Sequence, residues 1–325
     1  MERFWIVDDE WPDYDVEKEL LNKNHPGCEI RFSKAVNPKD LEEFGSVADA
    51  LICQINVPVD KSLLEKLKKC KVVSVYGAGY NNVDAAAARS LNVPVANVPG
   101  YCAEEVADYA MAAIYHQNLR LAHYASHVSN GLWGARAVKK KPRRVSQLTL
   151  FVVGFGFIGQ KLAEKASGVG MTVLYHDYVE SPVMKEKAQK FGARKVSIEE
   201  GLAKADVISS HLALTDETRG FFSNNIFAQM KKEAHFINAS RGGVVDEPAL
   251  IEAVKNGVIA AATLDVIVNE PPKPDDPILR AENICVTPHI SYLSEDSLRE
   301  LKFRAARNAS DIARGKDIPE IVNKR

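Results

Sequence analysis

The sequence lacks the usual marks of secreted, membrane-spanning and nucleic-acid-binding proteins. Its five cysteines are odd in number, scattered and without CxxC spacing, so we expect no disulfide framework and a reducing, cytoplasmic compartment. Lysine and arginine number 42 against 43 acidic residues, and a net charge of −1 gives no field to attract nucleic acid or an acidic membrane. No apolar run approaches the roughly 20 residues that cross a bilayer. The opening segment, MERFWIVDDEW, goes straight into an apolar strand followed by acids, so we expect no signal peptide.

What the chain does contain is the ordinary composition of a globular protein. Of its 325 residues, 46% are hydrophobic and 26% are charged. This length is large for a single hydrophobic core, so we expect two domains.

A glycine-rich segment stands near the middle of the sequence. Residues 148–153 form a short apolar run typical of a buried strand. The segment GFGFIG at 154–159 follows, then a helical pattern, and then a second apolar strand at 171–175 that leads to Asp177. A GxGxxG motif alone often marks only a turn. Between a strand and a helix, with an acid about 20 residues further on, it predicts dinucleotide binding.

The residue types of this motif have separate physical roles. Gly154 permits a tight turn, Gly156 lets the backbone approach a pyrophosphate, and Gly159 lets the helix pack closely on the strand. The free N–H groups and the positive dipole end of the helix favour phosphates. Asp177 can accept hydrogen bonds from ribose hydroxyls and would repel a 2′-phosphate, so the motif predicts NAD rather than NADP.

Strand and helix patterns alternate through the first hundred residues. This alternation predicts a parallel sheet with helices on both faces, and hence a small α/β domain. The predicted strands are 3–8, 29–32, 50–54, 72–76 and 93–98.

The same alternation resumes after Asp177. With 150–154 and 171–175 it gives about seven strands, which we expect in one doubly wound sheet. The other predicted strands are 195–198, 207–212, 235–239, 259–266 and 284–286.

Two long helices mark the expected domain boundaries. One is predicted from about Ala103 to His123, with an apolar face for a core or a partner subunit, and the other from Ser294 to about Arg314. We expect the last helix to return to the first domain. The expected domains are a discontinuous substrate (catalytic) domain, 1–102 with 291–325, and an NAD-binding Rossmann domain, 103–290.

Three further segments allow two interpretations each. The Gly- and Asn-rich loop 76–84 can turn several N–H groups toward an anion such as a carboxylate, or it can be a simple turn. His116, His123 and His127 are spaced to share one helical face; without an acid alongside, we expect surface or interface residues rather than a metal site. The basic run 139–144 resembles a nucleic-acid patch, but the neutral chain favours a solvated loop.

The ends of the later strands carry three side chains that suit one reaction. Ligands of doubly wound sheets bind beyond the carboxyl ends of the strands, and Arg241, Glu270 and His289 each follow such an end. A guanidinium can clamp a carboxylate and polarise a carbonyl. An imidazolium can protonate the carbonyl oxygen as hydride arrives, and a carboxylate can hold that imidazole in one tautomer. Together the three predict reduction of a 2-oxo acid.

The chain closely resembles the D-isomer-specific 2-hydroxy acid dehydrogenase family over essentially its whole length. In combination the matching motifs are highly specific. They are VYGAGYNNVD (75–84), NVPGYCAEEVADYA (97–110), GFGFIG (154–159), HLALTDETRG (211–220), INASRGGVVDE (237–247), ATLDV (262–266), NEPP (269–272) and TPHIS (287–291).

The resemblance implies an α/β fold of two doubly wound parallel-sheet (Rossmann-like) domains, a flavodoxin-like substrate domain and an NAD-binding domain, with a homodimer formed through the latter. It implies Arg241, Glu270 and His289 as catalytic residues and no metal. The cofactor-binding residues that it implies are Gly154, Gly156, Phe157, Ile158, Gly159, Asp177, His211, Thr215, Ala239, Ser240, Arg241, Asp265 and His289, with Asp265 beside the nicotinamide amide. The substrate-binding residues that it implies are Tyr76, Gly77, Ala78, Gly79, Arg241 and His289.

Two functions remain open. The motif at 97–110 and the stretch after His289 are most similar to the branch with C-terminal-binding-protein-like and phosphoglycerate-dehydrogenase-like members, some of which are NAD-sensing corepressors. Residues 291–293, Ser-Tyr-Leu, are bulkier than the small residues of many dehydrogenases and would crowd the substrate. The complete trio favours an NAD-dependent oxidoreductase that interconverts a small 2-oxo acid and its D-2-hydroxy acid. The alternative is a corepressor-like, NAD(H)-sensing interaction protein with weak or no physiological dehydrogenase activity.

Overall fold

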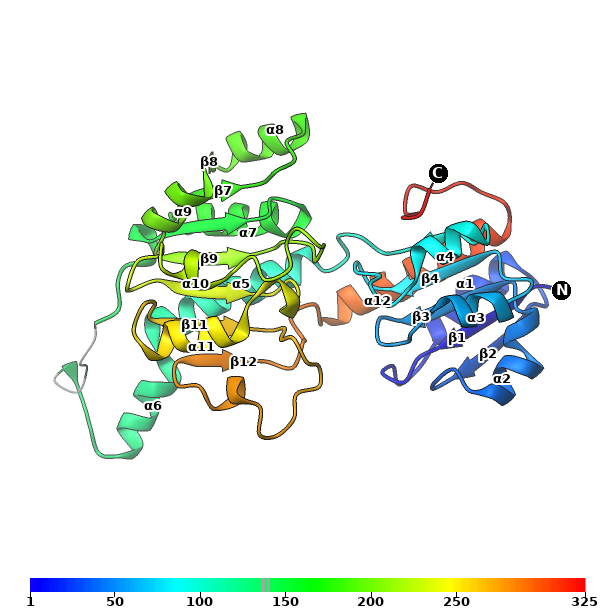
Figure 1. Cartoon of the computed structure of the whole chain (residues 1–325), viewed down its shortest axis with the longest axis horizontal. Helices are drawn as coiled ribbons and strands as arrows, with labels where there is room; N and C mark the ends of the chain where they lie inside the picture. Colours follow the sequence, from blue (N-terminus) through cyan, green and yellow to red (C-terminus); the bar gives the residue numbers. More distant parts are fainter. Residues whose placement is uncertain (136–137, 139–140, 325) are drawn as a thin grey trace. The chain divides into compact units, whose positions relative to one another are not determined.

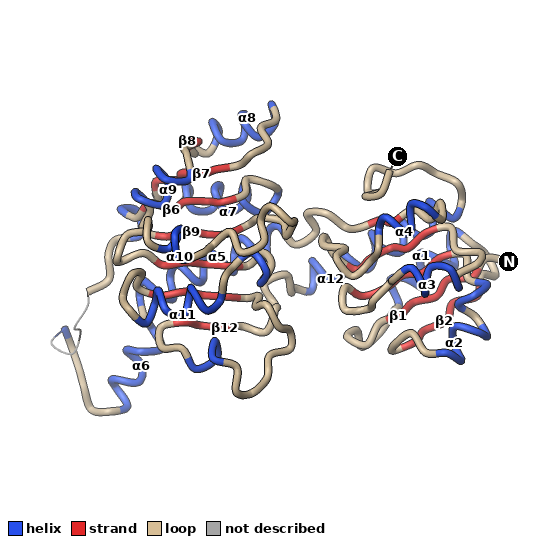
Figure 2. Tube along the Cα trace, in the orientation of Figure 1, coloured by secondary structure: helices blue, strands red, loops and turns tan. Residues whose placement is uncertain are grey.

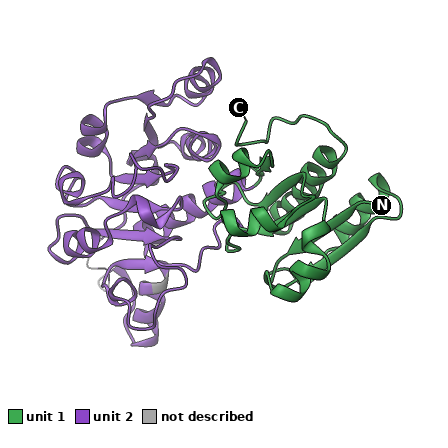
Figure 3. Cartoon of the chain, turned by 45° about the vertical axis from the view of Figure 1, so that its right-hand side comes forward, with its two compact units in different colours: residues 1–101, 294–325 green, residues 102–293 purple. Residues whose placement is uncertain are grey.

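The computed structural model describes residues 1–135, 138 and 141–324. The chain divides into two compact units, which Figure 3 shows in different colours. Residues 1–101 and 294–325 make up the first unit, and residues 102–293 make up the second. The first unit is therefore discontinuous in sequence and contains the last long helix.

A parallel sheet of five strands forms the middle of the first unit (Figure 1). The strand order is β2-β1-β3-β4-β5, which is the order of flavodoxin-like sheets, and it confirms the predicted fold class. The strands are β1 (Arg3–Val7), β2 (Glu29–Ser33), β3 (Ala50–Gln54), β4 (Val72–Tyr76) and β5 (Val95–Ala96).

Helices bury both faces of this sheet because its strands are apolar on both sides. One face, with Phe4, Ile6 and Val72, packs against α1 and α12; the other, with Trp5 and Val73, packs against α3 and α4. The helices are α1 (Asp15–Asn24), α2 (Pro38–Glu43), α3 (Lys61–Lys66), α4 (Ala85–Ser90) and α12 (Glu295–Ala313).

The second unit is built on a parallel sheet of seven strands in the order β12-β11-β10-β9-β6-β7-β8, as a doubly wound sheet requires. Figure 2 shows the strands in red with helices on both sides. The strands are β6 (Thr149–Val153), β7 (Thr172–His176), β8 (Arg194–Lys195), β9 (Val207–Ser210), β10 (His235–Asn238), β11 (Ala261–Leu264) and β12 (Ile284–Val286).

Two hydrophobic clusters cover the faces of this second sheet. One joins Leu150 and Val152 of β6 to α5 and α7, and the other joins Phe151 of β6 and Phe236 of β10 to α9, α10 and α11. The helices of this unit are α5 (Ala103–Leu119), α6 (Leu121–Ser129), α7 (Phe157–Gly168), α8 (Pro182–Lys190), α9 (Ile198–Lys204), α10 (Asn224–Phe227) and α11 (Glu247–Lys255).

The prediction of a single helix over 103–123 is wrong, because the helix is interrupted at Arg120. Arg120 has a left-handed backbone conformation, with a φ of 53°. It is the C-cap of α5, and its N–H donates a hydrogen bond to the carbonyl oxygen of His116. His116 therefore lies on α5, whereas His123 and His127 lie on α6 with ring centroids 4.2 Å apart. The three histidines do not share one continuous helix.

The strand predicted at 195–198 is also shorter than expected. Ser197 accepts a hydrogen bond from the N–H of Glu200 and caps α9, so the chain turns into a helix where the apolar run suggested continued extension. Among the described residues no helix is both long enough and apolar enough to cross a membrane.

Candidate active site

The glycine-rich turn connects β6 to α7, and two of its glycines are required by their surroundings. Gly154 has a φ of +94°, and a Cβ there would lie 2.6 Å from the carbonyl oxygen of His211. A Cβ on Gly159 would overlap the carbonyl oxygen of Gly154, so only glycine allows α7 to approach the turn this closely.

Gly156 is different, because among the described residues nothing beyond its chain neighbours and its own helix occupies the space beside it. Nothing described lies within 4 Å of a Cβ built at this position, and Gly156 is the N-cap of α7 without a side-chain cap. The first N–H groups of α7, at Phe157 and Ile158, are therefore available to an anion, with the helix dipole behind them. A pyrophosphate fits this arrangement.

Asp177 follows β7 and is tied to the same turn. Its Oδ2 accepts a hydrogen bond of 2.6 Å from the N–H of Phe155, and its Oδ1 accepts one of 2.8 Å from the N–H of Val179. A carboxylate has about four acceptor positions, so each oxygen can still accept from a ribose hydroxyl.

His211 and Thr215 follow β9 on the next connection. His211 accepts or shares a 2.9 Å hydrogen bond with the hydroxyl of Ser209 through Nε2, and burial lowers the pKa of its imidazole to about 4. The ring is therefore neutral at physiological pH. Thr215 lies in a turn where its N–H donates to the hydroxyl of Thr218 at 2.8 Å.

Arg241 emerges from the loop after β10, and Asn238 shapes this loop. The Asn238 carboxamide accepts from the N–H and hydroxyl of Ser240 and donates to the carbonyl of Arg241 at 3.0 Å. Ala239 is buried between them. A Cβ on Gly242 would overlap the carbonyl group of Ile267, so glycine is needed for this loop to lie against the one after β11.

Glu270 and His289 are brought together by the loops after β11 and β12. The Nδ1 atom of His289 lies 2.6 Å from Oε2 of Glu270, and Oε1 of Glu270 accepts the N–H of Ile267 at 2.9 Å. The side chains of His289 and Glu270 are 26% and 35% exposed, so a small molecule can reach them. Because Nδ1 faces Glu270, Nε2 is the ring nitrogen left for a substrate.

The pKa of Glu270 reflects opposing effects. Burial raises it, but the hydrogen bond and charge of His289, the N–H of Ile267 and the charge of Arg241 together bring it below the ordinary glutamate value. The carboxylate therefore stays ionised throughout the neutral range, and Arg241 belongs to the same electrostatic neighbourhood.

Asp265, which the family resemblance places beside the nicotinamide amide, follows β11. It is only 1% exposed and lies under the loop after β12. Its carboxylate accepts hydrogen bonds from the hydroxyl of Thr287 at 2.6 Å and from the N–H groups of Ile290 and Ser291 at 3.0 and 2.8 Å. Both carboxylate oxygens thus hold the segment that carries His289.

The end of β4 and the loop after it, which carry the predicted substrate-binding residues 76–79, belong to the first unit. The side chain of Tyr76 is 2% exposed and donates to Glu17 at 2.7 Å, and it is part of the core. Gly77 is buried, with its N–H donating to the carbonyl of Val75 at 2.9 Å, whereas Ala78 is exposed and Gly79 is half-buried. The carbonyl of Ala78 accepts a hydrogen bond from Asn97 at 2.6 Å. An anion cradle here would have to use backbone groups.

The sequence analysis missed two residues that shape the site. Asn238 organises the Arg241 loop, and a polar residue at the end of a buried strand was a usable signal. Tyr109 on α5 forms a 2.7 Å hydrogen bond with Thr287, and no spacing in the sequence pointed to it.

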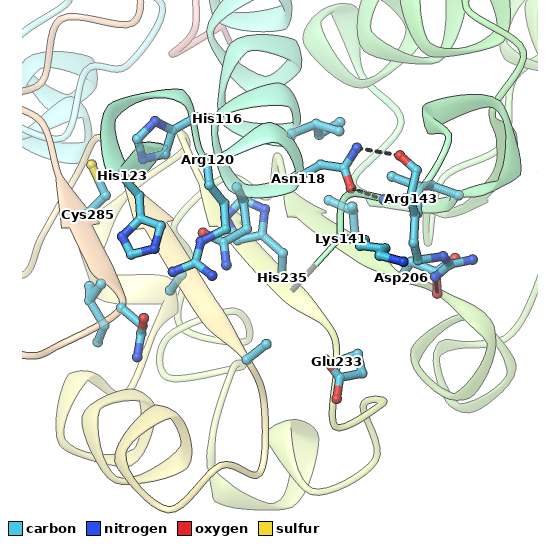
Figure 4. Close-up of a pocket in the computed structure, with 18 residues that line it drawn as sticks. His116, Asn118, Arg120, His123, Lys141, Arg143, Asp206, Glu233, His235 and Cys285 are labelled. Carbon is cyan, nitrogen blue, oxygen red and sulfur yellow. Dashed lines mark hydrogen bonds and ion pairs between the residues drawn. The ribbon is translucent and has the colours of Figure 1, made fainter. Parts of the chain in front are cut away.

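A separate cavity of about 760 Å³ opens near the amino ends of the strands of the second unit (Figure 4). His116, Arg120 and His123 line it, together with His235, whose pKa burial lowers to about 3. The described residues contain no group of three or more potential metal ligands.

The basic run 139–144 is described only in part. Arg143 forms an ion pair with Asp206 at 2.7 Å, while Lys139 and Lys140 lie outside the described residues.

Comparison with known proteins gives matches along most of the chain. The family model described as "D-isomer specific 2-hydroxyacid dehydrogenase, NAD binding domain" matches residues 111–291. A glyoxylate reductase from Korarchaeum cryptofilum is 34% identical over 277 residues, which cover 85% of this chain and 82% of that protein. A hydroxypyruvate reductase from Blautia hydrogenotrophica is 33% identical over 88% of this chain and 89% of its own length.

Solved structures match the fold as well. A glyoxylate reductase from Paecilomyes thermophila has a TM-score of 0.85 and 25% identity, covering 100% of this chain and 99% of that one. A D-lactate dehydrogenase from Aquifex aeolicus, solved with NAD and lactic acid, has a TM-score of 0.82 and 25% identity, covering 97% and 96% of the two chains.

Proposed function

Because this chain belongs to the D-isomer-specific 2-hydroxyacid dehydrogenase family, we propose that Arg241, Glu270 and His289 catalyse the reduction of a small 2-oxo acid by NADH to its D-2-hydroxy acid. The chain is an NAD-dependent oxidoreductase of this family. The observation that carries the catalytic proposal is the 2.6 Å contact between Nδ1 of His289 and Glu270, which leaves Nε2 accessible.

The second unit has the residues to hold the cofactor. We propose that the N–H groups at the start of α7, next to Gly156, bind the pyrophosphate and that Asp177 binds the adenosine ribose. The neutral His211 and the loop at Ala239 and Ser240 would contact the rest of the dinucleotide. When bound, NADH supplies the hydride that reduces the carbonyl carbon.

The three proposed catalytic side chains have separate roles: binding the substrate, donating the proton and stabilising the proton donor. Arg241 clamps the substrate carboxylate with its planar fork and orients the carbonyl. His289, protonated on both nitrogens, donates the Nε2 proton to the carbonyl oxygen while Nδ1–H stays on Glu270. Glu270 stabilises the imidazolium and fixes the ring. In the reverse direction the neutral ring takes the hydroxyl proton through Nε2.

The relatives and the residues after His289 support the proposed substrate class. The ring of Tyr292 lies perpendicular to the His289 ring at a centroid distance of 6.2 Å, so the site has an aromatic side chain close to its acid. This favours a compact 2-oxo acid. The test is NADH oxidation with glyoxylate, pyruvate, hydroxypyruvate and branched-chain 2-oxo acids; activity with none of them contradicts the proposed function and supports an interaction protein.

We also propose a cytoplasmic homodimer formed through the second unit. The five cysteines are all free, which is consistent with a reducing compartment. Large apolar side chains are exposed on α6 and just after it, at Leu121, Val128, Leu132 and Trp133. Sedimentation velocity of the full chain should give twice the monomer mass, and a monomer at micromolar concentration contradicts the dimer.

The choice of cofactor gives the first testable prediction. Asp177→Asn keeps an acceptor oxygen for the turn at Phe155 but removes the charge that would repel a 2′-phosphate. The unmodified protein should bind NADH at least about tenfold more tightly than NADPH, and the variant should lose most of that preference. Fluorescence titration with both cofactors measures it. Equal affinities in the unmodified protein contradict the assignment of Asp177.

Glu270 gives a prediction about pH. Its pKa lies below the ordinary glutamate value, so the carboxylate is ionised throughout the neutral range and its charge favours the imidazolium form of the ring beside it. Glu270→Gln removes the charge that favours the imidazolium. The alkaline limb of kcat/KM for reduction should then move to lower pH by about one unit or more. A limb that stays in place shows that the carboxylate does not support the ring.

A further inference from the structure

His289 has an uncommon backbone conformation that its neighbours must maintain. Its φ is +54°, in the left-handed region that residues with a side chain rarely adopt. Such a conformation persists only where surrounding contacts hold it. Here the N–H of His289 donates to the carbonyl oxygen of Asp265 at 2.9 Å.

The side chain of Asp265 supplies the other contacts that hold this segment. It accepts the N–H groups of Ile290 and Ser291, the two residues that follow His289, and the hydroxyl of Thr287, two residues before it. The direction in which the imidazole leaves the backbone therefore depends on where the Asp265 carboxylate lies.

Thr287 connects Asp265 to a distant helix. Its hydroxyl lies 2.6 Å from Oδ1 of Asp265 and 2.7 Å from the hydroxyl of Tyr109 on α5. A threonine hydroxyl has one hydrogen, and the short contact with a carboxylate requires it there. Tyr109 must then be the donor to Thr287. Burial, as the largest effect, raises the pKa of Tyr109 to about 12, so its phenol keeps the hydrogen that it donates.

We propose that Tyr109 is a positioning residue for His289, acting through the hydroxyl of Thr287 and the carboxylate of Asp265. The hydrogen bonds run in one direction, from Tyr109 to Thr287 to Asp265, and they end on the carboxylate that fixes the backbone on both sides of His289. Its catalytic consequence rests on the proposed function of His289; the positioning itself does not.

The test begins with Tyr109→Phe, which removes one hydroxyl. One hydrogen bond contributes about a fivefold change in population, so kcat for reduction should fall about fivefold. KM for the oxo acid and the Kd for NADH should stay within about twofold. The matched control is Tyr115→Phe on the same helix, because no hydroxyl partner of Tyr115 exists among the described residues. This control should behave like the unmodified protein.

A double-mutant cycle with Thr287→Val separates positioning from general stability. If Tyr109 acts through Thr287, the double variant should be no slower than Thr287→Val alone. Fully additive losses overturn the proposal, as does a kcat of Tyr109→Phe equal to that of Tyr115→Phe.

A spectroscopic measurement keeps this inference distinct from the proposed function. In protein with 13C-labelled histidine, the His289 imidazole signal is identified by its absence from His289→Gln. Tyr109→Phe should shift or broaden this signal, and Tyr115→Phe should not. If the protein reduces no 2-oxo acid but the signal moves, the positioning stands and the proposed function fails. An unmoved signal overturns the positioning, whatever the activity.

Discussion

Replacing His289 by glutamine should remove nearly all reductase activity while leaving the cofactor bound. Glutamine has a similar length but cannot donate a proton as an acid, and a positioned acid–base group contributes roughly 10²- to 10⁴-fold. We expect kcat for the best 2-oxo acid to fall by about that factor, in both directions of the reaction.

The experiment needs a histidine that lies elsewhere in the same unit. His116 is such a control, since it lines the cavity near the amino ends of the strands, whereas His289 follows a carboxyl end. His116→Gln should retain full activity. NADH titration by fluorescence should give similar Kd values for both variants and the unmodified protein. A His289→Gln protein with more than about a tenth of the original kcat would mean that another group supplies the proton.

Replacing Arg241 by lysine should weaken the substrate and not the cofactor. Lysine keeps the positive charge but loses the planar fork that holds a carboxylate with two parallel hydrogen bonds. A charge-assisted hydrogen bond contributes about 1.5–3 kcal/mol, so KM for the 2-oxo acid should rise by roughly 10- to 150-fold. The Kd for NADH should stay nearly constant, because the change lies beyond the phosphates and the adenosine ribose.

A matched variant on the same unit tests whether the effect is local. Arg280 is exposed and lies at the end of a short 3₁₀ helix between β11 and β12. Arg280→Lys therefore makes the same substitution of a guanidinium by an ammonium group at a residue that is not part of the proposed site. Steady-state kinetics of the two variants with one substrate decide the matter. If Arg241→Lys has the KM of Arg280→Lys, then Arg241 is structural and the substrate carboxylate is bound elsewhere.

The local pattern of the sequence determined the fold class of the protein. Apolar runs alternating with helical periodicity predicted two parallel α/β sheets, and the strand orders of five and seven strands agree with that prediction. The GxGxxG turn was predictable because part of the requirement for glycine is local. A left-handed φ at Gly154 and the packing of α7 against the turn arise within a dozen residues. The proximity of Glu270 and His289 followed from a general rule, since carboxyl ends of adjacent parallel strands meet at one edge.

Side-chain direction was decided only by the tertiary structure. Tyr76 ends a strand next to the predicted anion loop, but its ring packs in the core and its hydroxyl meets Glu17, 59 residues away. Asp265 ends another strand, yet both of its oxygens face the chain's own loop. The alternation of side chains along a strand determines which face of the sheet each side chain lies on. Which residues it contacts on that face depends on segments far apart in sequence.

The break at Arg120 and the role of Tyr109 have the same origin. Helical periodicity continues through Arg120, and only a left-handed backbone there separates α5 from α6. The sequence pattern around Tyr109 predicts only that it belongs to an amphipathic helix. Its hydrogen-bond partner Thr287 is 178 positions away. A hydrogen bond across that separation has no local pattern. Periodicity along the chain therefore determined the elements, and the residue types at the strand ends indicated the reaction class. Long-range packing decided which side chains hold His289 in place.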